Sequence, residues 1–409
     1  MKISLASSAA RKRNTKTVEA RPPMQNFQNT DDDYLNLALA LAGRALGNVW
    51  PNPAVGCVLV SGDHLVGHIV GRNVGHIVGR GWTQPGGRPH AEAKALEQAG
   101  AAAKGATAYV SLEPCAHHGQ TPPCAGALIA AGVGRVVIAT GDPDPRVNGR
   151  GARMLEDAGI DVTWAEPKMA RAAAALNDGF INKVKNDRPL VTLKLASTLD
   201  GRIATPTGES QWITGAGARA KGHLLRAEHD AILVGIGTAL ADDPELSCRL
   251  PGMVDRSPVR VVLDRRLRLP LHSRLVQGVP DLPLWIMTGP DCADPNSQRT
   301  EMESKGVVVN GVALDAEGRI DLAAMLRVLA GQGITRLLVE GGSAVATSFL
   351  SARLVDHLAW FRAPGLMGGD GLAVVAALGV EALAQMPRFH RQSIEVLGDD
   401  VLESYVFQA

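Results

Sequence analysis

The sequence predicts an α/β protein built from two domains. The chain has 409 residues, more than one hydrophobic core ordinarily organises, so its length favours two domains. Segments with helical and strand patterns alternate in both halves, which is typical of layered α/β sheets. Hydrophobic residues make up 45% and charged residues 20% of the chain, which argues against wholesale disorder and against a fibrous repeat.

The first half begins with a predicted helix. From Asp31 to Ala45, apolar side chains recur at helical spacing, and Gly47 closes the pattern. Residues 54–60 form a buried strand whose hairpin partner runs toward Trp82. The later elements are predicted as a helix over 90–100, a strand over 107–112, a helix over 124–131, a strand over 135–140, a helix over 151–158, a strand over 161–164 and an Ala-rich helix between 167 and 187.

An exact repeat lies inside this hairpin. Residues 66–72 and 74–80 both read Val-Gly-His-Ile-Val-Gly-Arg, and two copies are too few for a solenoid. His68 and His76 would face the same side of a straight strand but lie about 26 Å apart, so they cannot share one metal ion. We therefore expect a tandem insertion that lengthens or bulges the hairpin.

The second half restarts with a strand over 190–195. The charged segment 182–188 precedes Pro189, and we interpret it as an inter-domain connection. The elements that follow are a turn at 200–201, a helix over 218–228, strands over 231–234, 259–263, 284–288 and 306–309, a helix over 322–330, a strand over 336–339 and a helix over 343–354. This order predicts a second α/β domain.

Composition disfavours nucleic-acid and membrane partners. The 42 Lys and Arg residues balance 41 acids, the net charge is +1, and aromatic residues make up 4% of the chain. Neither the basic footprint nor the stacking surface of a nucleic-acid binder is therefore expected. No uncharged apolar stretch approaches the roughly 18 residues that a membrane span requires.

Cysteine usage and the N-terminus predict a cytoplasmic protein. Five scattered cysteines lack the density of a secreted disulfide scaffold, so we expect reduced thiols kept for chemistry or metal binding. Residues 1–30 carry a basic cluster over 11–16 but no apolar run long enough for a signal peptide. We expect a flexible polar tail there, with an organelle transit peptide as the alternative.

The strongest chemical signal is a set of three potential zinc ligands. His90 precedes a predicted helix, Cys115 follows a strand, and Cys124 opens the next helix. One imidazole and two thiolates suit zinc, and three protein ligands leave the fourth tetrahedral position for water, whose pKa zinc lowers to roughly 7. Glu92, two residues after His90, matches the proton-transferring Glu of the H-x-E signature in zinc nucleobase deaminases.

Other interpretations of these residues stay open at this point. A closed structural zinc site would use His117 or His118 as its fourth ligand, and a buried His beside two ordinary thiols would bind no metal. A disulfide between Cys115 and Cys124 is disfavoured by a reducing compartment. The two cysteines are also separated by eight residues, whereas the usual signature is P-C-x-x-C.

A glycine pair in the second half is a potential phosphate site. The predicted strand 336–339 runs into Glu340, Gly341 and Gly342, and Ser343 opens a helix. Two glycines allow backbone N–H groups to approach an anion at the positive end of that helix, although a simple tight turn explains the pattern equally. Gly235-Ile-Gly237 lacks the third glycine of a Rossmann fingerprint.

Three longer runs resemble the bifunctional riboflavin-biosynthesis family. They are residues 83–92 (TQPGGRPHAE), 112–124 (LEPCAHHGQTPPC) and 194–202 (KLASTLDGR). The family joins a diaminohydroxyphosphoribosylaminopyrimidine deaminase to a 5-amino-6-(5-phosphoribosylamino)uracil reductase, and the eight-residue cysteine gap is its own spacing. The resemblance extends from about Asp31 to the C-terminus, whereas the duplicated hairpin departs from the family pattern.

The resemblance implies both the fold and the domain bounds. It implies a cytidine-deaminase-like three-layer α/β/α domain followed by a dihydrofolate-reductase-like α/β domain. We accordingly expect a zinc-dependent pyrimidine deaminase domain over 31–178, a linker over 179–187 and an NADPH-dependent reductase domain over 188–409, after the tail at 1–30.

The resemblance also implies the binding residues. For NADPH these are Ala196, Trp212, Thr238, Asp242, Gly342, Ser343, Ala344, Val345, Ala346, Thr347 and Ser348. For the phosphoribosyl substrate they are Ser210, Arg226, Leu246, Arg249 and Glu340, with the two arginines expected at its phosphate. Asn52 and the loop 142–145 match the family's pyrimidine pocket, with plain turn residues as the alternative. Arg265 stands where relatives have a small polar residue and is not carried over.

The predicted function is bifunctional catalysis in riboflavin biosynthesis. Zinc-dependent hydrolysis would deaminate 2,5-diamino-6-(5-phosphoribosylamino)pyrimidin-4-one, and NADPH would then reduce the ribosyl side chain to ribitylamino. The alternative is a zinc deaminase of nucleosides or nucleic acid with a non-catalytic ligand-binding second domain; a structural zinc protein is a third class. The expected partners are the small-molecule substrate and further copies of the chain, as a dimer or tetramer formed through the reductase domain.

Overall fold

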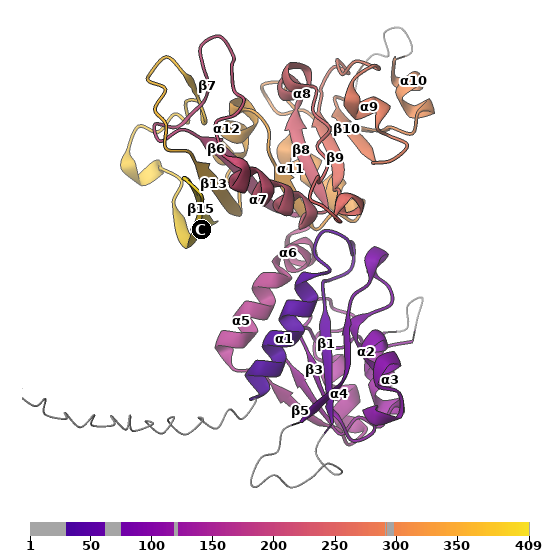
Figure 1. The fold of residues 1–409 in the computed structure, drawn as a ribbon. Coiled ribbons are helices and arrows are strands. Elements are labelled where there is room, and N and C mark those ends of the chain that lie inside the picture. Colours follow the sequence, from indigo (N-terminus) through magenta and orange to yellow (C-terminus); the bar gives the residue numbers. More distant parts are fainter. Residues whose placement is uncertain (1–29, 62–74, 118–121, 291, 293–297, 409) are drawn as a thin grey trace, which may run out of the picture.

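The computed structural model describes residues 30–61, 75–117, 122–290, 292 and 298–408. They form two α/β domains, drawn one below the other in Figure 1. Residues 1–29 of the tail predicted over 1–30, the first copy of the repeat and His118 lie outside the described residues. In the described part of the chain, no helix is long and apolar enough to cross a membrane.

The first domain is built on a five-stranded sheet of order β2-β1-β3-β4-β5. β1 pairs antiparallel with both β2 and β3, whereas β3, β4 and β5 run parallel. The strands are β1 (Gly56–Ser61), β2 (His76–Trp82), β3 (Thr107–Val110), β4 (Arg135–Ile138) and β5 (Asp161–Trp164). The helices are α1 (Asp31–Gly43), α2 (Ala91–Ala99), α3 (Cys124–Ala130), α4 (Arg150–Asp157) and α5 (Pro167–Leu176).

Helices cover both faces of this sheet, which confirms the expected three-layer arrangement. α1 and α5 pack on one face through a cluster that includes Leu35, Val58 and Ala173, and α2, α3 and α4 pack on the other (Figure 1). The strands alternate side chains between these two clusters because successive residues point to opposite faces. Small residues bring α2 close to the sheet, since a Cβ at Gly81 would lie 2.1 Å from the Ala91 carbonyl oxygen.

Polar contacts fix the start of α1. Thr30 caps the helix through a capping box with Asp33, which satisfies two backbone donors that the first turn leaves unpaired. Asp31 accepts hydrogen bonds from both terminal nitrogens of Arg135, at 3.0 and 2.7 Å, and from the Tyr109 hydroxyl at 2.9 Å. The helix is thereby tied to β3 and β4.

The second copy of the repeat forms most of β2. This strand pairs with β1 through a register shift between Leu59 and Val60, and the hairpin end at 62–74, where the predicted insertion falls, lies outside the described residues. His76 begins the strand and is exposed. His68, the other potential ligand of the repeat, lies outside the described residues.

The segment between the domains is helical. α6 (Asp178–Asn186) includes most of the expected linker and follows α5 directly. Asn177, between the two helices, is buried and exchanges two hydrogen bonds with the backbone of Ala54, at 2.9 and 3.0 Å. Asp178 forms a 2.8 Å ion pair with Arg336 of the second domain. Both domains are therefore anchored to this helical junction.

The second domain contains a nine-stranded sheet of order β11-β10-β9-β8-β12-β6-β13-β16-β15. All neighbouring pairs are parallel except β13–β16 and β16–β15. Its strands are β6 (Leu190–Ser197), β8 (Ala231–Gly235), β9 (Val259–Leu263), β10 (Leu284–Thr288), β11 (Val308–Gly311), β12 (Arg336–Val339), β13 (His357–Arg362), β15 (Phe389–Leu397) and β16 (Asp400–Phe407); β7 (Arg202–Ala204) and β14 (Leu372–Ala373) form a separate pair.

Helices pack on both faces of this sheet as well. The helices are α7 (Ala216–Ala227), α8 (Ile236–Asp242), α9 (Arg274–Gln277), α10 (Gln298–Ser304), α11 (Leu322–Gly331) and α12 (Ser343–Ser351). α11 and α12 share one core cluster with β6, β8 and β12, and α8, α9 and α10 share another with β8, β9 and β10. β8 and β12 lie near the centre of the sheet and run parallel to their neighbours. Their carboxyl ends therefore lie at the same edge of the sheet, which is where α/β proteins bind ligands.

The predicted elements of both domains are present, with ends that differ by a few residues. The predicted strand over 306–309 is β11, which begins at Val308, and the helix over 343–354 ends at Ser351. β7, β13 to β16 and the short helices α8 to α10 were not predicted. β13, β16 and β15 extend the sheet beyond β6.

Candidate active sites

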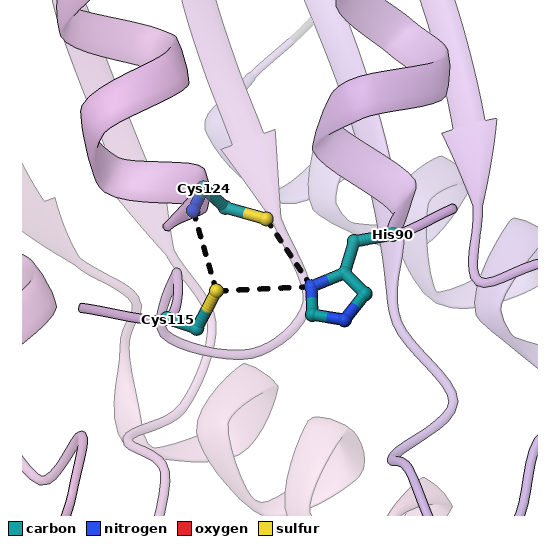
Figure 2. Close-up of side chains that lie close together, drawn as sticks. All are labelled: His90, Cys115 and Cys124. Atoms are coloured by element: carbon teal, nitrogen blue, oxygen red, sulfur yellow. Dashed lines mark hydrogen bonds between the residues drawn. The ribbon is translucent and has the colours of Figure 1, made fainter. Parts of the chain in front are cut away.

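Three donor side chains converge in the first domain, as Figure 2 shows. The His90 Nδ1 atom lies 3.3 Å from the Cys124 Sγ atom and 3.7 Å from the Cys115 Sγ atom. The ligand atoms of all three residues lie within 4.8 Å of one another. A tetrahedral zinc with ligand bonds of about 2.0–2.3 Å separates its donors by about 3.5 Å, so the cluster fits zinc.

Helix starts position these donors. His90 is the residue before α2, Cys124 is the first residue of α3, and Cys115 lies in the loop after β3. The Cys124 backbone N–H donates a hydrogen bond to the Cys115 sulfur at 3.2 Å. The positive end of α3 therefore faces the Cys115 sulfur, and this favours the thiolate form of Cys115 that binds metal.

The thiol environment agrees with metal binding. Hydrogen bonding from Cys124, and then from the His90 ring, outweighs burial and lowers the pKa of Cys115 to about 4. All five cysteines are free, so the disulfide alternative is absent. Within the described residues, this is the one group of three or more potential ligands, and His117 does not belong to it. His118 lies outside the described residues.

Glu92 lies beside this cluster in the first turn of α2. Its side chain is buried, and burial followed by the charge of Cys115 raises its pKa. A raised pKa suits a carboxyl group that must hold and release a proton near neutral pH. Glu92 is not among the grouped ligand atoms, so it is not one of the three potential metal ligands.

Glu113 organises the loop that carries Cys115, and the sequence analysis missed it. Its carboxylate is buried and accepts hydrogen bonds from the backbone N–H groups of Gly149 and Gly151, both at 2.9 Å, and from Ala152 at 3.2 Å. The charge thus caps the start of α4. Glu113 lies inside the run 112–124, two residues before the potential zinc ligand Cys115. This position was the sequence feature that could have identified it.

The expected pyrimidine-pocket residues lie on two loops of the first domain. Asn52 donates a 3.1 Å hydrogen bond to the Gly87 carbonyl oxygen, in the segment that leads to His90. Asp142 is buried, and its carboxylate accepts a 2.8 Å hydrogen bond from the Asp144 backbone. Burial raises the pKa of Asp142 to about 6. These contacts are structural, and a role toward a substrate remains a proposal.

The second domain holds a cavity of about 840 Å³ at the carboxyl ends of β6, β8 and β12. Most residues expected to bind NADPH or substrate line it together. They are Ala196, Ser210, Trp212, Arg226, Thr238, Asp242, Arg249, Glu340, Gly342, Ser343, Ala344, Val345 and Ala346. The cavity is therefore large enough, and has the right lining, to hold parts of two ligands.

Three expected residues do not line this cavity. Leu246 is 4% exposed and belongs to the hydrophobic cluster beneath α8 and α9. Thr347 and Ser348 face a second cavity on the other flank of α12. The Thr347 hydroxyl also donates a 2.7 Å hydrogen bond to the Ser343 carbonyl oxygen, so its proton is already used within α12.

Arg226 was expected to bind the phosphate of the substrate, but its guanidinium group is paired within the protein. Its guanidinium group binds the Glu340 carboxylate through two hydrogen bonds, at 2.8 and 2.9 Å, and donates a third to the Ser247 carbonyl oxygen at 3.0 Å. The Lys194 ammonium lies 3.8 Å from the same carboxylate. Sequence reasoning missed Lys194 as a lining residue, although it opens the run 194–202.

The glycine turn brings the backbone close to neighbouring elements. A Cβ at Gly341 would lie 2.6 Å from the Val234 Cα atom, and Gly342 has a φ of +55°. Side chains are therefore excluded at both positions. No side chain caps the start of α12, whose first residues line the cavity, and a helix start of this kind suits an anionic group.

An exposed tryptophan and a half-buried arginine also line this cavity. Trp212 is 67% exposed, and the Arg219 guanidinium lies 4.8 Å from the centre of its ring, within cation–π range. Both residues line the cavity. A large flat side chain held at the mouth provides apolar surface for a ligand ring.

Fold and sites define a class: a zinc-binding domain of the deaminase type joined to a second α/β domain with a ligand cavity. Residues 28–140 match the model of the cytidine and deoxycytidylate deaminase zinc-binding region, and residues 189–402 match that of the RibD C-terminal domain. The chain is 42% identical over 382 residues to the riboflavin biosynthesis protein RibD of Escherichia coli, covering 91% of this chain and 98% of that protein.

Solved structures agree. Acinetobacter baumannii RibD, form 1, matches with a TM-score of 0.80 at 37% identity and covers 93% of this chain and 99% of its own. A deaminase/reductase from Thermotoga maritima matches with a TM-score of 0.77 at 34% identity, over 92% and 99%. The chain belongs to the RibD family of riboflavin biosynthesis proteins. Its expected two-domain fold is confirmed, and a nucleic-acid deaminase with a non-catalytic second domain is not favoured.

Proposed function

We propose that this chain catalyses two consecutive steps of riboflavin biosynthesis. The first domain hydrolytically deaminates 2,5-diamino-6-(5-phosphoribosylamino)pyrimidin-4-one, and the second reduces the ribosyl side chain of the product to a ribitylamino chain. Family membership over both domains supports this pairing. The observation that carries it is the convergence of His90, Cys115 and Cys124 beside the buried carboxyl group of Glu92.

In the deaminase site, His90, Cys115 and Cys124 would hold Zn²⁺ through one nitrogen and two sulfur atoms. Zinc with three protein ligands activates water as a nucleophile near neutral pH. Glu92 takes the proton from the attacking water and delivers it to the departing amino nitrogen, so that ammonia leaves the pyrimidine carbon. Burial of this carboxyl group favours its protonated form and raises its pKa.

Asn52 and Asp142 are the residues we assign to recognition of the pyrimidine. Both lie on loops of the first domain, and Asn52 contacts the segment leading to His90. An amide and a carboxyl group offer the donors and acceptors that a diaminopyrimidine edge requires. The Asp142 side chain, whose pKa is raised to about 6, can both donate and accept near neutral pH.

In the reductase site, NADPH would lie along the start of α12 with its pyrophosphate on the backbone N–H groups of that turn. NADPH supplies the hydride that reduces the ribosyl carbon, and a proton from a neighbouring group completes the opened sugar chain. Ser210, Arg249 and Glu340 are assigned to the substrate, since all three line the cavity. The hydroxyl and guanidinium groups suit its phosphate, and the carboxylate suits its sugar hydroxyls.

The Arg226–Glu340 pair has a positioning role in this proposal. Its guanidinium group holds the carboxylate in one orientation through two hydrogen bonds. Lys194 adds a second positive charge near the carboxylate. With Arg249 also at the cavity wall, the surroundings favour an anionic substrate such as a phosphoribosyl compound.

Self-association through the reductase domain and a cytoplasmic location belong to the same proposal. β15 is the edge strand of the nine-stranded sheet, and its Ile394 and Val396 side chains are 52% and 73% exposed. Exposed apolar side chains on an edge strand are a common surface for pairing between copies. Sedimentation analysis of the full chain should give a dimer or tetramer, and a monomer at micromolar concentration would contradict this part.

Two assays on one purified protein test the proposal. Incubation with the phosphoribosylaminopyrimidine alone should release ammonia. When NADPH is then added, it should be oxidised, and this oxidation should require the deaminated product. The Glu92→Gln variant should lose ammonia release but still oxidise NADPH when supplied with the deaminated substrate. Failure of both activities in zinc-loaded protein would overturn the proposal.

A further inference from the structure

The chain between α1 and β1 lies at the junction of the two domains (Figure 1). It first contacts the second domain at Gly47, where a Cβ would lie 2.3 Å from the carbonyl oxygen of Ala227, the last residue of α7. One guanidinium nitrogen of Arg256, which precedes β9, donates hydrogen bonds to this same oxygen and to the Leu46 carbonyl oxygen. Arg256 therefore joins the first-domain chain to the end of α7.

Trp50 makes the second contact of this segment with the second domain. Its ring centre lies 6.4 Å from that of Trp285 in β10, and the two rings meet edge to face. A Cβ at Gly333 would lie 3.2 Å from the Trp50 ring, so the absence of a side chain there allows the ring to approach. Trp50 also packs against the core cluster that α11 and α12 share with the central strands. This first-domain side chain is therefore anchored in the second domain.

The same segment contacts the chain that leads to the zinc cluster. The Asn48 carbonyl oxygen accepts a 2.9 Å hydrogen bond from the Gly86 backbone N–H. Asn52 donates its 3.1 Å hydrogen bond to the Gly87 carbonyl oxygen, and a Cβ at Gly87 would lie 1.9 Å from the Asn52 side-chain nitrogen. Residues 46–52 thus connect the second domain to the approach to the deaminase site.

We propose that Arg256 and Trp285 of the second domain are positioning residues for the deaminase reaction of the first. They act through residues 46–52, which hold the Asn52 amide where it contacts the pyrimidine. The inference rests on the proposed deaminase function and on the assignment of Asn52 to pyrimidine recognition.

The local geometry explains why binding of the pyrimidine is the step affected. The Asn52 backbone N–H donates to the carbonyl oxygen of the buried Val49 at 3.0 Å, so Trp50 and Asn52 belong to one turn and move together. A recognition group that shifts loses its contact with the substrate. The zinc donors lie at the starts of α2 and α3 and in the loop after β3. Loss of the junction contacts should therefore weaken binding of the pyrimidine more than binding of zinc.

The Arg256→Met variant of the full, zinc-loaded chain tests this inference. Methionine keeps much of the apolar length of arginine but cannot donate to the two carbonyl oxygens. The KM for the phosphoribosylaminopyrimidine in ammonia release should rise about 3- to 10-fold, with kcat changed by less than about twofold. Zinc content should equal that of the parent. Arg256→Lys keeps a donor and should return the KM to within about twofold of the parent value.

Trp285→Leu is an independent second variant. It removes the ring beside Trp50, and it should raise the same KM without loss of zinc, even where Arg256→Met does not fold. Arg299→Met is the matched control, because Arg299 belongs to the same domain and pairs at 3.0 Å with Glu303 along α10. This control should keep the parent KM.

Hydrogen–deuterium exchange adds a measurement that does not depend on activity. In Arg256→Met and Trp285→Leu, peptides covering residues 84–90 should exchange faster than in the parent, because the Gly86 N–H loses a fixed acceptor. In Arg299→Met, exchange over these residues should match the parent.

The parent KM and the parent exchange rate over 84–90 in both junction variants would overturn the inference. Loss of zinc together with a fall in kcat would also overturn it, because the junction would then support the metal site rather than pyrimidine binding. So would failure of both variants to fold, since the contacts would then serve the fold alone. Absence of ammonia release by the zinc-loaded parent would instead remove the deaminase proposal, and this inference with it.

Discussion

Glu340 and Arg226 form a two-pronged ion pair at the wall of the reductase cavity. The Nε and Nη2 atoms of Arg226 donate to the two carboxylate oxygens at 2.8 and 2.9 Å, joining α7 to the end of β12. Burial acts to raise the pKa of Glu340, but the charges of Arg226 and Lys194 outweigh it and hold this pKa at about 2. The carboxylate is therefore ionised throughout the physiological range.

Replacing Glu340 by Gln should damage both stability and reduction. The change leaves Arg226, which is 15% exposed, without its counter-charge, and breaking a buried pair costs about 3–5 kcal/mol. Urea unfolding should detect this loss, and NADPH oxidation should fall while ammonia release is retained. Glu245→Gln is the control, because the exposed Glu245 side chain pairs with Arg274 at the surface. Losing this surface ion pair should cost no more than about 1 kcal/mol of unfolding free energy. Equal unfolding free energies for the two variants would contradict the burial argument.

Replacing Glu92 by Gln should separate the two activities. The amide keeps the size of the buried side chain but cannot transfer a proton, so deamination should fall by about 10²-fold or more. Zinc content, measured by plasma emission spectrometry, should equal that of the parent, and reduction of the deaminated substrate should be unchanged. Deamination at the parent rate would refute the assignment of Glu92.

Replacing Gly151 by Ala should weaken zinc binding at a distance. A Cβ at this position would lie 1.9 Å from the Pro114 carbonyl oxygen, and the loop that carries Cys115 would have to move. We expect reduced zinc content and slower deamination in dialysed protein. Gly126→Ala in α3 is the control, since its Cβ meets nothing closer than 3.5 Å and alanine favours helix by up to about 1 kcal/mol. Full zinc retention in Gly151→Ala would contradict the packing argument.

His229 should make the reductase domain lose stability in acid. The side chain is buried between Thr192 and the Leu225 carbonyl oxygen, and burial lowers its pKa to about 3. Between pH 6.5 and 3 the unfolded chain therefore binds a proton that the folded chain excludes, so stability falls as the pH falls through this window. The slope is about 1.4 kcal/mol per pH unit.

The His229→Gln variant isolates this contribution. Gln cannot be protonated, so the difference in unfolding free energy between parent and variant should shrink by about 2 kcal/mol from pH 6.5 to 5.0. Urea unfolding at these two pH values measures it. A difference that stays constant with pH would show that His229 already carries a proton in the folded protein.

The zinc cluster was accessible to sequence analysis because its ligands lie where local structure is easily recognised. His90 and Cys124 begin helices whose apolar patterns are clear, and each is next to a proline. The sequence spacing of His90, Glu92 and the two cysteines then restricts the chemistry to very few possibilities. The structure brings these residues together as predicted.

The reductase cavity was less accessible for a physical reason. Arg226 and Glu340 are 114 residues apart, so their mutual ion pair depends on the order of β6, β8 and β12 rather than on any local pattern. The sequence around an isolated arginine does not show whether its guanidinium group pairs with a carboxylate of the protein or binds a phosphate of a ligand. Leu246 was expected at the substrate, yet its apolar side chain packs in the core.

The unpredicted elements are those with weak periodic signals. α9 has four residues and α8 and α10 have seven each, too few to display an amphipathic repeat. β15 is exposed along nearly its whole length, so its side chains do not show the alternation between buried and exposed positions that marks a half-buried strand. Its position depends on pairing with β16.

X-ray absorption at the zinc edge is the most direct test of the metal site on which the deaminase assignment depends. For protein loaded with one zinc per chain, we predict two sulfur ligands, one imidazole nitrogen and one further light atom from solvent. The Cys115→Ser variant should lose one sulfur or lose the metal. A spectrum with two imidazole rings and two sulfurs, or a chain that binds no zinc, would contradict an open catalytic site formed by His90, Cys115 and Cys124.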